Sequence, residues 1–232
     1  MSPSVDIVIP TYNGTLRIER AVRSAIAEAI SIAADFVLIA VDDGSSDGSP
    51  ELLQELAATE PRMRVLVNRN NLGIPQTRNR AIRSGTAEFV AFLDQDDEWI
   101  PGSLGRRIDA LTSEPALGFV VSSQVMKLDK GQARPPWCRP EWLDRPVPGY
   151  LPSTLVARRR AFVDLGLFDE SYRSGGDDAE WFARARTRHT PHLMLEEPAV
   201  VRYVHDRNAS ADPRLGRDLL SLVRRYVQGE ER

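Results

Sequence analysis

Four acidic residues follow directly after a short apolar run, and this is the stretch of the chain best suited to chemistry. The run, residues 89–93, has the length and composition of a buried strand. Carboxylates that gather at the end of one strand repel one another, and a divalent cation with a phosphate group commonly offsets that repulsion. The alternative is a solvated loop with a helix cap before Pro101. The acids are Asp94, Asp96, Asp97 and Glu98.

The elements before this stretch indicate how its acids are positioned. Apolar runs and amphipathic segments alternate three times, which predicts strands over 5–9, 36–41 and 64–68, each followed by a helix, over 16–34, 50–58 and 75–84. Such repeats are typical of a parallel sheet covered by helices on both faces. Ligands bind beyond the carboxyl ends of the strands in these sheets. The polar loops 11–14, 42–49 and 94–97 are therefore expected to meet in one crevice.

The second half is less regular. It predicts helices over 102–113, 159–166 and 177–188, strands over 117–122, 154–157 and 199–205, and an amphipathic helix over 215–228. A proline-rich segment, residues 131–152, is expected to be an irregular loop, and its Trp137 and Trp142 are candidates for acceptor contact, whereas Trp181 is expected in the core.

Composition narrows the class of protein. The chain has 232 residues and a net charge of −3, which gives no electrostatic case for nucleic acid binding. The single Cys138 excludes an intrachain disulfide and a cysteine-based zinc site. A signal peptide and a membrane-spanning apolar run are not expected, so a cytoplasmic location is the default. Glycine-rich phosphate-binding loops and a Gly-x-Ser-x-Gly elbow do not occur in the sequence.

Six motifs in order resemble family 2 glycosyltransferases with the GT-A fold. They lie at 9–14, 41–49, 71–79, 92–97, 166–181 and 205–210. The resemblance implies an α/β fold with a Rossmann-like, mostly parallel central sheet flanked by helices and a smaller acceptor-side portion. It further implies a single GT-A domain over 1–232, with a nucleotide-sugar-binding half over about 5–97, an acceptor and catalytic half over about 98–210, and a terminal helix over 213–232.

The resemblance also assigns the donor-binding residues. Tyr12 is expected to pack on the nucleobase, and Asp43 to accept a hydrogen bond from it; Asp42 could take that role or cap the loop. Arg78 could contact the diphosphate or be a salt-bridged residue of its helix. The full expected set is Pro10, Thr11, Tyr12, Asn13, Asp42, Asp43, Asn71, Gly73, Arg78, Asp94 and Gln95.

The metal and the general base follow from the same resemblance. A divalent cation, Mn²⁺ or Mg²⁺, is expected on Asp96 and Asp94, and His205 is either a further ligand or a structural residue. Asp178 is the expected general base, because an acceptor hydroxyl is a weak nucleophile until its proton is removed. Asp177 is a supporting or alternative base, and the alternative for both residues is a helix cap.

The implied activity is inverting, metal-dependent transfer of one sugar from a nucleoside diphosphate donor, with UDP favoured, by direct displacement. A Gln-x-x-Arg-Trp motif and membrane helices, which mark the processive members of the family, are not found. The acceptor could be a glycan, a lipid-linked glycan or a small molecule. The terminal helix leaves open a homodimer, with peripheral membrane contact at most. A sugar nucleotidyltransferase and a non-catalytic nucleotide-sugar-binding protein are the alternatives.

Overall fold

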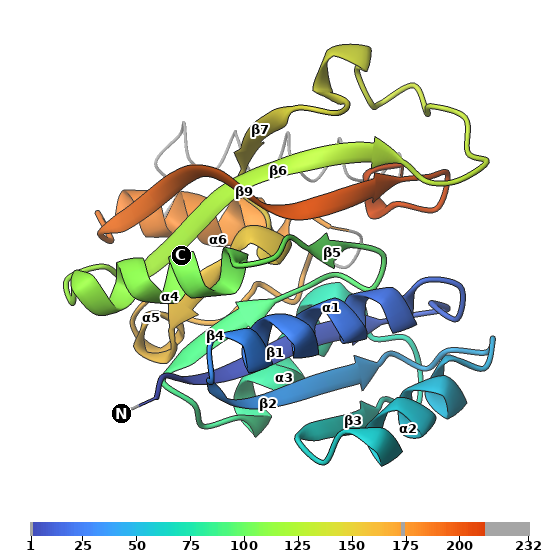
Figure 1. Ribbon diagram of the computed structural model, residues 1–232, viewed down its shortest axis with the longest axis horizontal. Helices are drawn as coiled ribbons and strands as arrows, with labels where there is room; N and C mark the ends of the chain where they lie inside the picture. The colour runs from blue at the N-terminus through green and yellow to red at the C-terminus, as the bar shows by residue number, and fades with distance from the viewer. Residues whose placement is uncertain (1, 173–174, 212–232) are drawn as a thin grey trace.

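The computed structural model describes residues 2–172 and 175–211, and a single sheet runs through this part of the chain (Figure 1). The strand order is β3-β2-β1-β4-β8-β6-β9-β5, and β7 pairs with β6 beside this path. The strands are β1 (Ser4–Thr11), β2 (Asp35–Asp42), β3 (Met63–Val67), β4 (Phe89–Phe92), β5 (Glu98–Trp99), β6 (Phe119–Leu128), β7 (Pro146–Gly149), β8 (Val156–Arg158) and β9 (His192–Val204).

The first half of the sheet is parallel, as predicted. β1 pairs in parallel with β2 and with β4, and β2 pairs in parallel with β3. Seven consecutive residues of β1, Val5 to Thr11, are buried, because helices cover both faces of the sheet. The carboxyl ends of β1, β2 and β4 therefore reach the same edge of the sheet.

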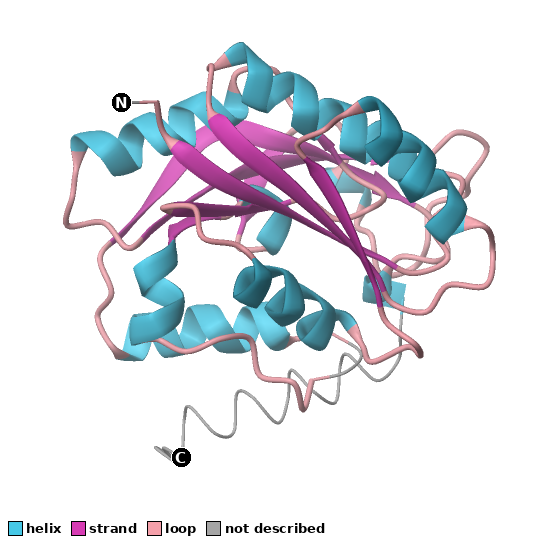
Figure 2. Ribbon diagram, turned by 90° about the horizontal axis from the view of Figure 1, so that it is seen from below, coloured by secondary structure: helices cyan, strands magenta, loops and turns pink. Residues whose placement is uncertain are grey.

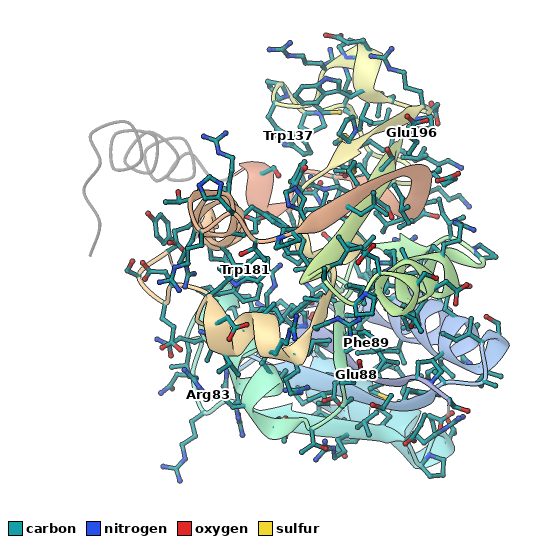
Figure 3. The ribbon with its side chains drawn as sticks, turned by 90° about the vertical axis from the view of Figure 1, so that its left-hand side faces the viewer. Arg83, Glu88, Phe89, Trp137, Trp181 and Glu196 are labelled. Atoms are coloured by element: carbon teal, nitrogen blue, oxygen red, sulfur yellow. The ribbon has the colours of Figure 1, made fainter. Side chains whose placement is uncertain are left out.

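Helices lie in two layers, one on each face of the sheet (Figure 2). α1 (Ile18–Ser31), α2 (Ser49–Thr59) and α4 (Ser103–Ser113) share one core cluster with the sheet. α3 (Ile74–Ser84), α5 (Arg159–Asp164) and α6 (Asp177–Thr187) share the other. Trp181 of α6 lies in that second core, against Phe119 and Phe162, as predicted (Figure 3).

The second half of the sheet is mixed. β8 runs antiparallel to β4 and to β6, whereas β6 and β9 are parallel. β5 pairs antiparallel with β9, so the segment after the acidic stretch is joined to the end of the described chain. This pairing brings the late motif at 205–210 next to Asp96.

Three sequence-based expectations need correction. The segment 131–152 is not wholly irregular, because it contains a 3-10 turn, Pro140–Trp142, and strand β7. The two prolines of β7 are tolerated because, among the described strands, β7 pairs with β6 alone and therefore lies at an edge. β9 begins at His192, seven residues before the predicted start. β5 was not predicted. The expected terminal helix over 213–232 lies outside the described residues. In the described part of the chain, no helix has the length and hydropathy to cross a membrane.

Candidate functional site

A cavity of about 730 Å³ lies where the loops after β1, β2 and β4 meet the start of α6. It brings together twelve of the predicted site residues from both halves of the chain. They are Pro10, Thr11, Tyr12, Asp43, Asn71, Gly73, Arg78, Asp94, Gln95, Asp96, Asp177 and Asp178.

The other three predicted residues do not line this cavity. Asn13 and His205 line an adjoining cavity of about 250 Å³, which shares Tyr12, Gln95 and Asp96 with the larger one. Asp42 is fully buried, and its Oδ2 accepts the backbone N–H groups of Gly44 and Ser45. The geometry therefore gives Asp42 the loop-capping role that the sequence left open.

Asp43 holds the loop that enters α3. Its Oδ1 accepts hydrogen bonds from Asn68 Nδ2 (2.7 Å) and from the amide of Leu72 (2.9 Å), and its Oδ2 accepts one from the amide of Gly73 (2.8 Å). Gly73 has φ +98°, which favours glycine at this turn. A carboxylate oxygen has room for a second donor, so Oδ2 of Asp43 keeps an acceptor position toward the cavity.

Gln95 fixes the backbone of Tyr12 with both ends of its amide. The N–H of Tyr12 donates to Gln95 Oε1 (2.9 Å), and Gln95 Nε2 donates to the carbonyl oxygen of Tyr12 (3.0 Å). A Cβ at Gly14 would lie 2.2 Å from that Oε1, so glycine leaves the space in which the Gln95 amide sits. The ring of Tyr12 is 46% exposed and borders the cavity.

Arg78 joins the two halves of the site. Its Nη2 donates to Asp94 Oδ1 (2.8 Å) and its Nη1 to Asp177 Oδ2 (2.9 Å), while the residue itself is buried. The salt-bridge alternative for Arg78 is therefore observed, with Asp94 and Asp177 as its partners. The two carboxylates hold the pKa of Arg78 above its ordinary value against the effect of burial.

Asp177 and Asp178 begin α6 and have different surroundings. Asp177 is buried and ion-paired; burial raises its pKa to about 7, although Arg78 opposes the rise. Asp178 is half-buried and borders the cavity, and its Oδ1 accepts the N–H of Ala179 (2.7 Å). Burial also raises the pKa of Asp178, opposed by Arg78. A carboxylate that forms no ion pair with the described residues and has a raised pKa is suited to accept a proton.

Asp96 faces the late motif. Its Oδ2 accepts hydrogen bonds from Nε2 of His205 (2.9 Å) and from Nδ2 of Asn208 (3.0 Å). Nδ1 of His205 accepts the N–H of Arg207 (3.1 Å), so Nε2 carries the ring proton. Burial would raise the pKa of Asp96, but the hydrogen bond and charge of His205 outweigh it, and the pKa is lowered.

Asp97 behaves as a structural acid. It is buried, and its Oδ2 accepts the hydroxyl of Ser153 (2.8 Å). Burial first, and then the neighbouring Asp96 and Asp94, raise its pKa well above the ordinary value. These contacts indicate that Asp97 supports the loop after β4.

Several residues of the cavity were not predicted. Arg202 and Arg207 border it, and neither forms an ion pair with a described residue. Arg202 donates a hydrogen bond to Ser210 Oγ (2.7 Å), and its guanidinium carbon lies 5.7 Å from the centre of the Trp137 ring. A charged residue inside the apolar run of β9 could have drawn attention to Arg202, whereas no sequence signal marks Gln124 or Tyr150 of the same cavity.

The two tryptophans of the proline-rich segment lie elsewhere. Trp137 (Figure 3) and Trp142 pack against a small core of Met126, Cys138 and Val204. Neither is among the described residues that line the cavity. They are therefore not placed to contact an acceptor in this cavity.

Comparison with known proteins identifies the family. The family model described as Glycosyl transferase family 2 matches residues 6–165 of the chain. The chain therefore belongs to glycosyl transferase family 2. It is 30% identical over 265 aligned positions to the succinoglycan biosynthesis protein ExoU of Rhizobium meliloti, an alignment that covers 96% of this chain and 74% of that protein.

Solved structures share the fold. The mannosyltransferase PcManGT of Pyrobaculum calidifontis, solved with GDP-Man and Mn²⁺, aligns with a TM-score of 0.73 at 18% identity, covering 97% of this chain and 65% of that one. S. aureus TarS, solved with UDP, aligns with a TM-score of 0.67 at 19% identity, covering 97% and 64%. The expected GT-A fold is confirmed. Four other curated relatives match over shorter stretches, and the chain spans 32–45% of their length.

Proposed function

We propose that the protein is a metal-dependent, inverting glycosyltransferase that transfers one sugar from a nucleoside diphosphate donor to an acceptor hydroxyl. The observation that carries this proposal is a single cavity that holds both sets of groups the reaction needs. Asp94 and Asp96 line it from the loop after β4, and Asp178 lines it from the start of α6. Residues 5–97 then serve the donor, and residues 98–210 supply the base and the acceptor contacts.

The residues around Asp96 fit a divalent cation. Asp96 Oδ2 and His205 Nε2 lie 2.9 Å apart, so both atoms could contact one cation, while the described residues contain no group of three or more His, Cys, Asp or Glu suited to a metal ion. For Nε2 of His205 to hold a cation, the ring proton would have to move to Nδ1, which would then no longer accept the N–H of Arg207. Asp96 and His205 would hold it, with Asp94 nearby on the cavity wall. The cation would supply positive charge to a leaving diphosphate.

Side chains of this chain also meet the donor. Tyr12 offers its ring to the nucleobase, and Asp43 offers the free acceptor position of Oδ2 to a base N–H. Arg202 and Arg207 are the cations in the cavity without an ion pair to a described residue, so they are suited to the diphosphate oxygens. Arg78 is occupied by Asp94 and Asp177, and it positions those carboxylates rather than the donor.

The choice of base follows from the different surroundings of the two acids. Asp177 is held by Arg78, whereas Asp178 borders the cavity and forms no ion pair with a described residue. We therefore assign proton removal from the acceptor hydroxyl to Asp178. A base that activates the acceptor while the diphosphate leaves in the same step inverts the anomeric centre, because the two groups act on opposite faces of the sugar.

We propose UDP as the donor nucleotide. TarS, solved in complexes with UDP and with UDP-GlcNAc, supports this choice, whereas the complex of PcManGT holds GDP-Man. The donor sugar is identified by screening a series of UDP-sugars, with GDP-sugars as the comparison.

Donor consumption tests the proposed function. The protein is incubated with Mn²⁺ and a panel of nucleotide sugars, and release of the nucleoside diphosphate is measured with and without a chelator. We expect slow hydrolysis of one donor, abolished by the chelator and by Asp96→Ala. Metal-dependent binding without consumption would indicate a binding protein, and release of inorganic diphosphate from a nucleoside triphosphate and a sugar phosphate would indicate nucleotidyl transfer.

A further inference from the structure

Part of the cavity is built by uncharged residues that the donor contacts described above do not use. We call this part the β6–β7 wall: Gln124, Pro148, Tyr150, Leu151 and Pro152. Gln124 lies on β6, where it pairs with Val147 of β7, and Tyr150 directly follows the end of β7. The wall combines apolar surface, one aromatic ring and one amide, which is the usual make-up of a small-molecule subsite.

The side-chain oxygen of Gln124 is buried and has no hydrogen-bond partner among the described residues. The residue as a whole is 8% exposed. A buried polar atom left unpaired destabilises the free protein, so such a group calls for an explanation, and a ligand is one. An amide offers a donor and an acceptor side by side, which matches two adjacent hydroxyl groups.

Tyr150 brings an exposed ring close to the proposed base. Its side chain is 49% exposed, and its ring packs at 5.3 Å and 83° against the ring of Phe182. Phe182 stands one helical turn after Asp178 on the same face of α6. Gly149, which precedes Tyr150, lets β7 approach β6 closely, because a Cβ there would lie 2.8 Å from the carbonyl oxygen of Ser122. The ring is therefore held against Phe182 of α6 and borders the same cavity as Asp178.

We propose that the β6–β7 wall is the acceptor subsite and that its occupant is an uncharged pyranose ring. This inference rests on the proposed function. A pyranose offers a C–H face to Tyr150 and adjacent hydroxyls to Gln124, and it can present a further hydroxyl to Asp178. An apolar aglycone would leave the side-chain oxygen of Gln124 unpaired, an acyclic polyol has no ring face, and the wall carries no cation for an anionic group.

The first test needs no acceptor. Gln124→Met keeps the length of the side chain and removes the unpaired oxygen, so the melting temperature of the free protein should rise by about 2–4 °C. The matched control is Gln54→Met, at an exposed position of α2, which should leave the melting temperature unchanged. A fall in the melting temperature of Gln124→Met would show that the amide is satisfied in the free protein and would overturn its assignment to a ligand.

The second test measures acceptor use with defined probes. Donor consumption is followed with the methyl glycosides of glucose, galactose and N-acetylglucosamine, with the methyl glycoside of glucuronic acid, and with ribitol. We expect an uncharged pyranoside to accelerate donor consumption. Tyr150→Leu should lower kcat/KM for that pyranoside by about 10-fold or more, with the loss in acceptor KM rather than in UDP affinity, and Tyr150→Phe should restore it to within about 3-fold.

Two results would overturn the acceptor assignment. One is acceleration by ribitol or the glucuronide alone, or by no probe at all, in a protein that still binds UDP by calorimetry. The other is an unchanged acceptor kcat/KM in Tyr150→Leu. A protein that binds no nucleoside diphosphate would instead refute the proposed function, so the two failures are distinguishable.

Discussion

Replacement of Arg78 by Met tests how the two halves of the site are joined. Arg78 is buried between Asp94 and Asp177, with N–O distances of 2.8 and 2.9 Å. Methionine has a similar length but no charge, so the variant leaves the carboxyl of Asp177, whose side chain is 2% exposed, without its cation. Nothing else in the described structure would neutralise that group at its present position.

The size of the effect follows from burial. Removing one partner of a buried ion pair costs about 3–5 kcal/mol, and each kcal/mol lowers the melting temperature of a chain of this size by about 2–4 °C. We therefore expect Arg78→Met to lower the melting temperature by about 10 °C near pH 8.

The same variant has a defined pH dependence. Burial already raises the pKa of Asp177 to about 7, and Arg78 holds it down, so removing Arg78 raises it further. A carboxyl whose pKa is raised on folding contributes stability that is present below its unfolded pKa and lost as pH rises through its folded pKa. The deficit of Arg78→Met should therefore be large at pH 8 and small at pH 5.

Thermal unfolding of the wild type, Arg78→Met and the double variant Arg78→Met/Asp177→Asn at both pH values provides the assay. The double variant should recover much of the loss at pH 8, because an amide in place of Asp177 needs no cation. An equal deficit at pH 5 and pH 8, or no deficit at pH 8, would refute the electrostatic reasoning.

Two further predictions concern donor binding and the base. Gln95→Leu should weaken UDP affinity about 10-fold in calorimetry, because both hydrogen bonds to the backbone of Tyr12 are lost. Gly14→Ala should also weaken UDP affinity, because its Cβ would displace the Gln95 amide. Unchanged UDP affinity in both variants would contradict the role of Gln95 in holding Tyr12. Asp178→Asn should bind UDP and lose sugar transfer, and full activity of Asp178→Asn would show that another residue is the base. The transfer rate of the wild type should fall as pH drops toward the raised pKa of Asp178, since the base must be ionised.

The parallel half of the fold could be predicted from local patterns. The buried strands β1, β2 and β4 are largely apolar runs, interrupted in β1 by Asp6, and amphipathic helices follow the first two. The hydrophobic period and the order of these segments were therefore sufficient to predict them. β7 was missed because its two prolines argue against a strand unless an edge position is known. The first half of β9 was missed because Glu196, Glu197 and Pro198 interrupt its apolar pattern.

The carboxylates of the site could be predicted, but their partners could not. Asp96 and Asp178 follow from motifs in the chain. Their surroundings depend on contacts between distant residues, such as Arg78 with Asp177, 99 residues apart, which no local pattern contains. Tyr150 and Gln124 belong to no motif, and only the pairing of β6 with β7 brings them into the cavity.

Calorimetric titration of UDP into the protein, with Mn²⁺ and with a chelator, tests metal-assisted donor binding most directly. The arrangement of Asp96 and His205 predicts that UDP binds much more tightly with Mn²⁺ than with the chelator. Asp96→Ala with Mn²⁺ should bind UDP only as tightly as the wild type does with the chelator. UDP affinity that is the same with Mn²⁺, with chelator and in Asp96→Ala would contradict the proposed donor site.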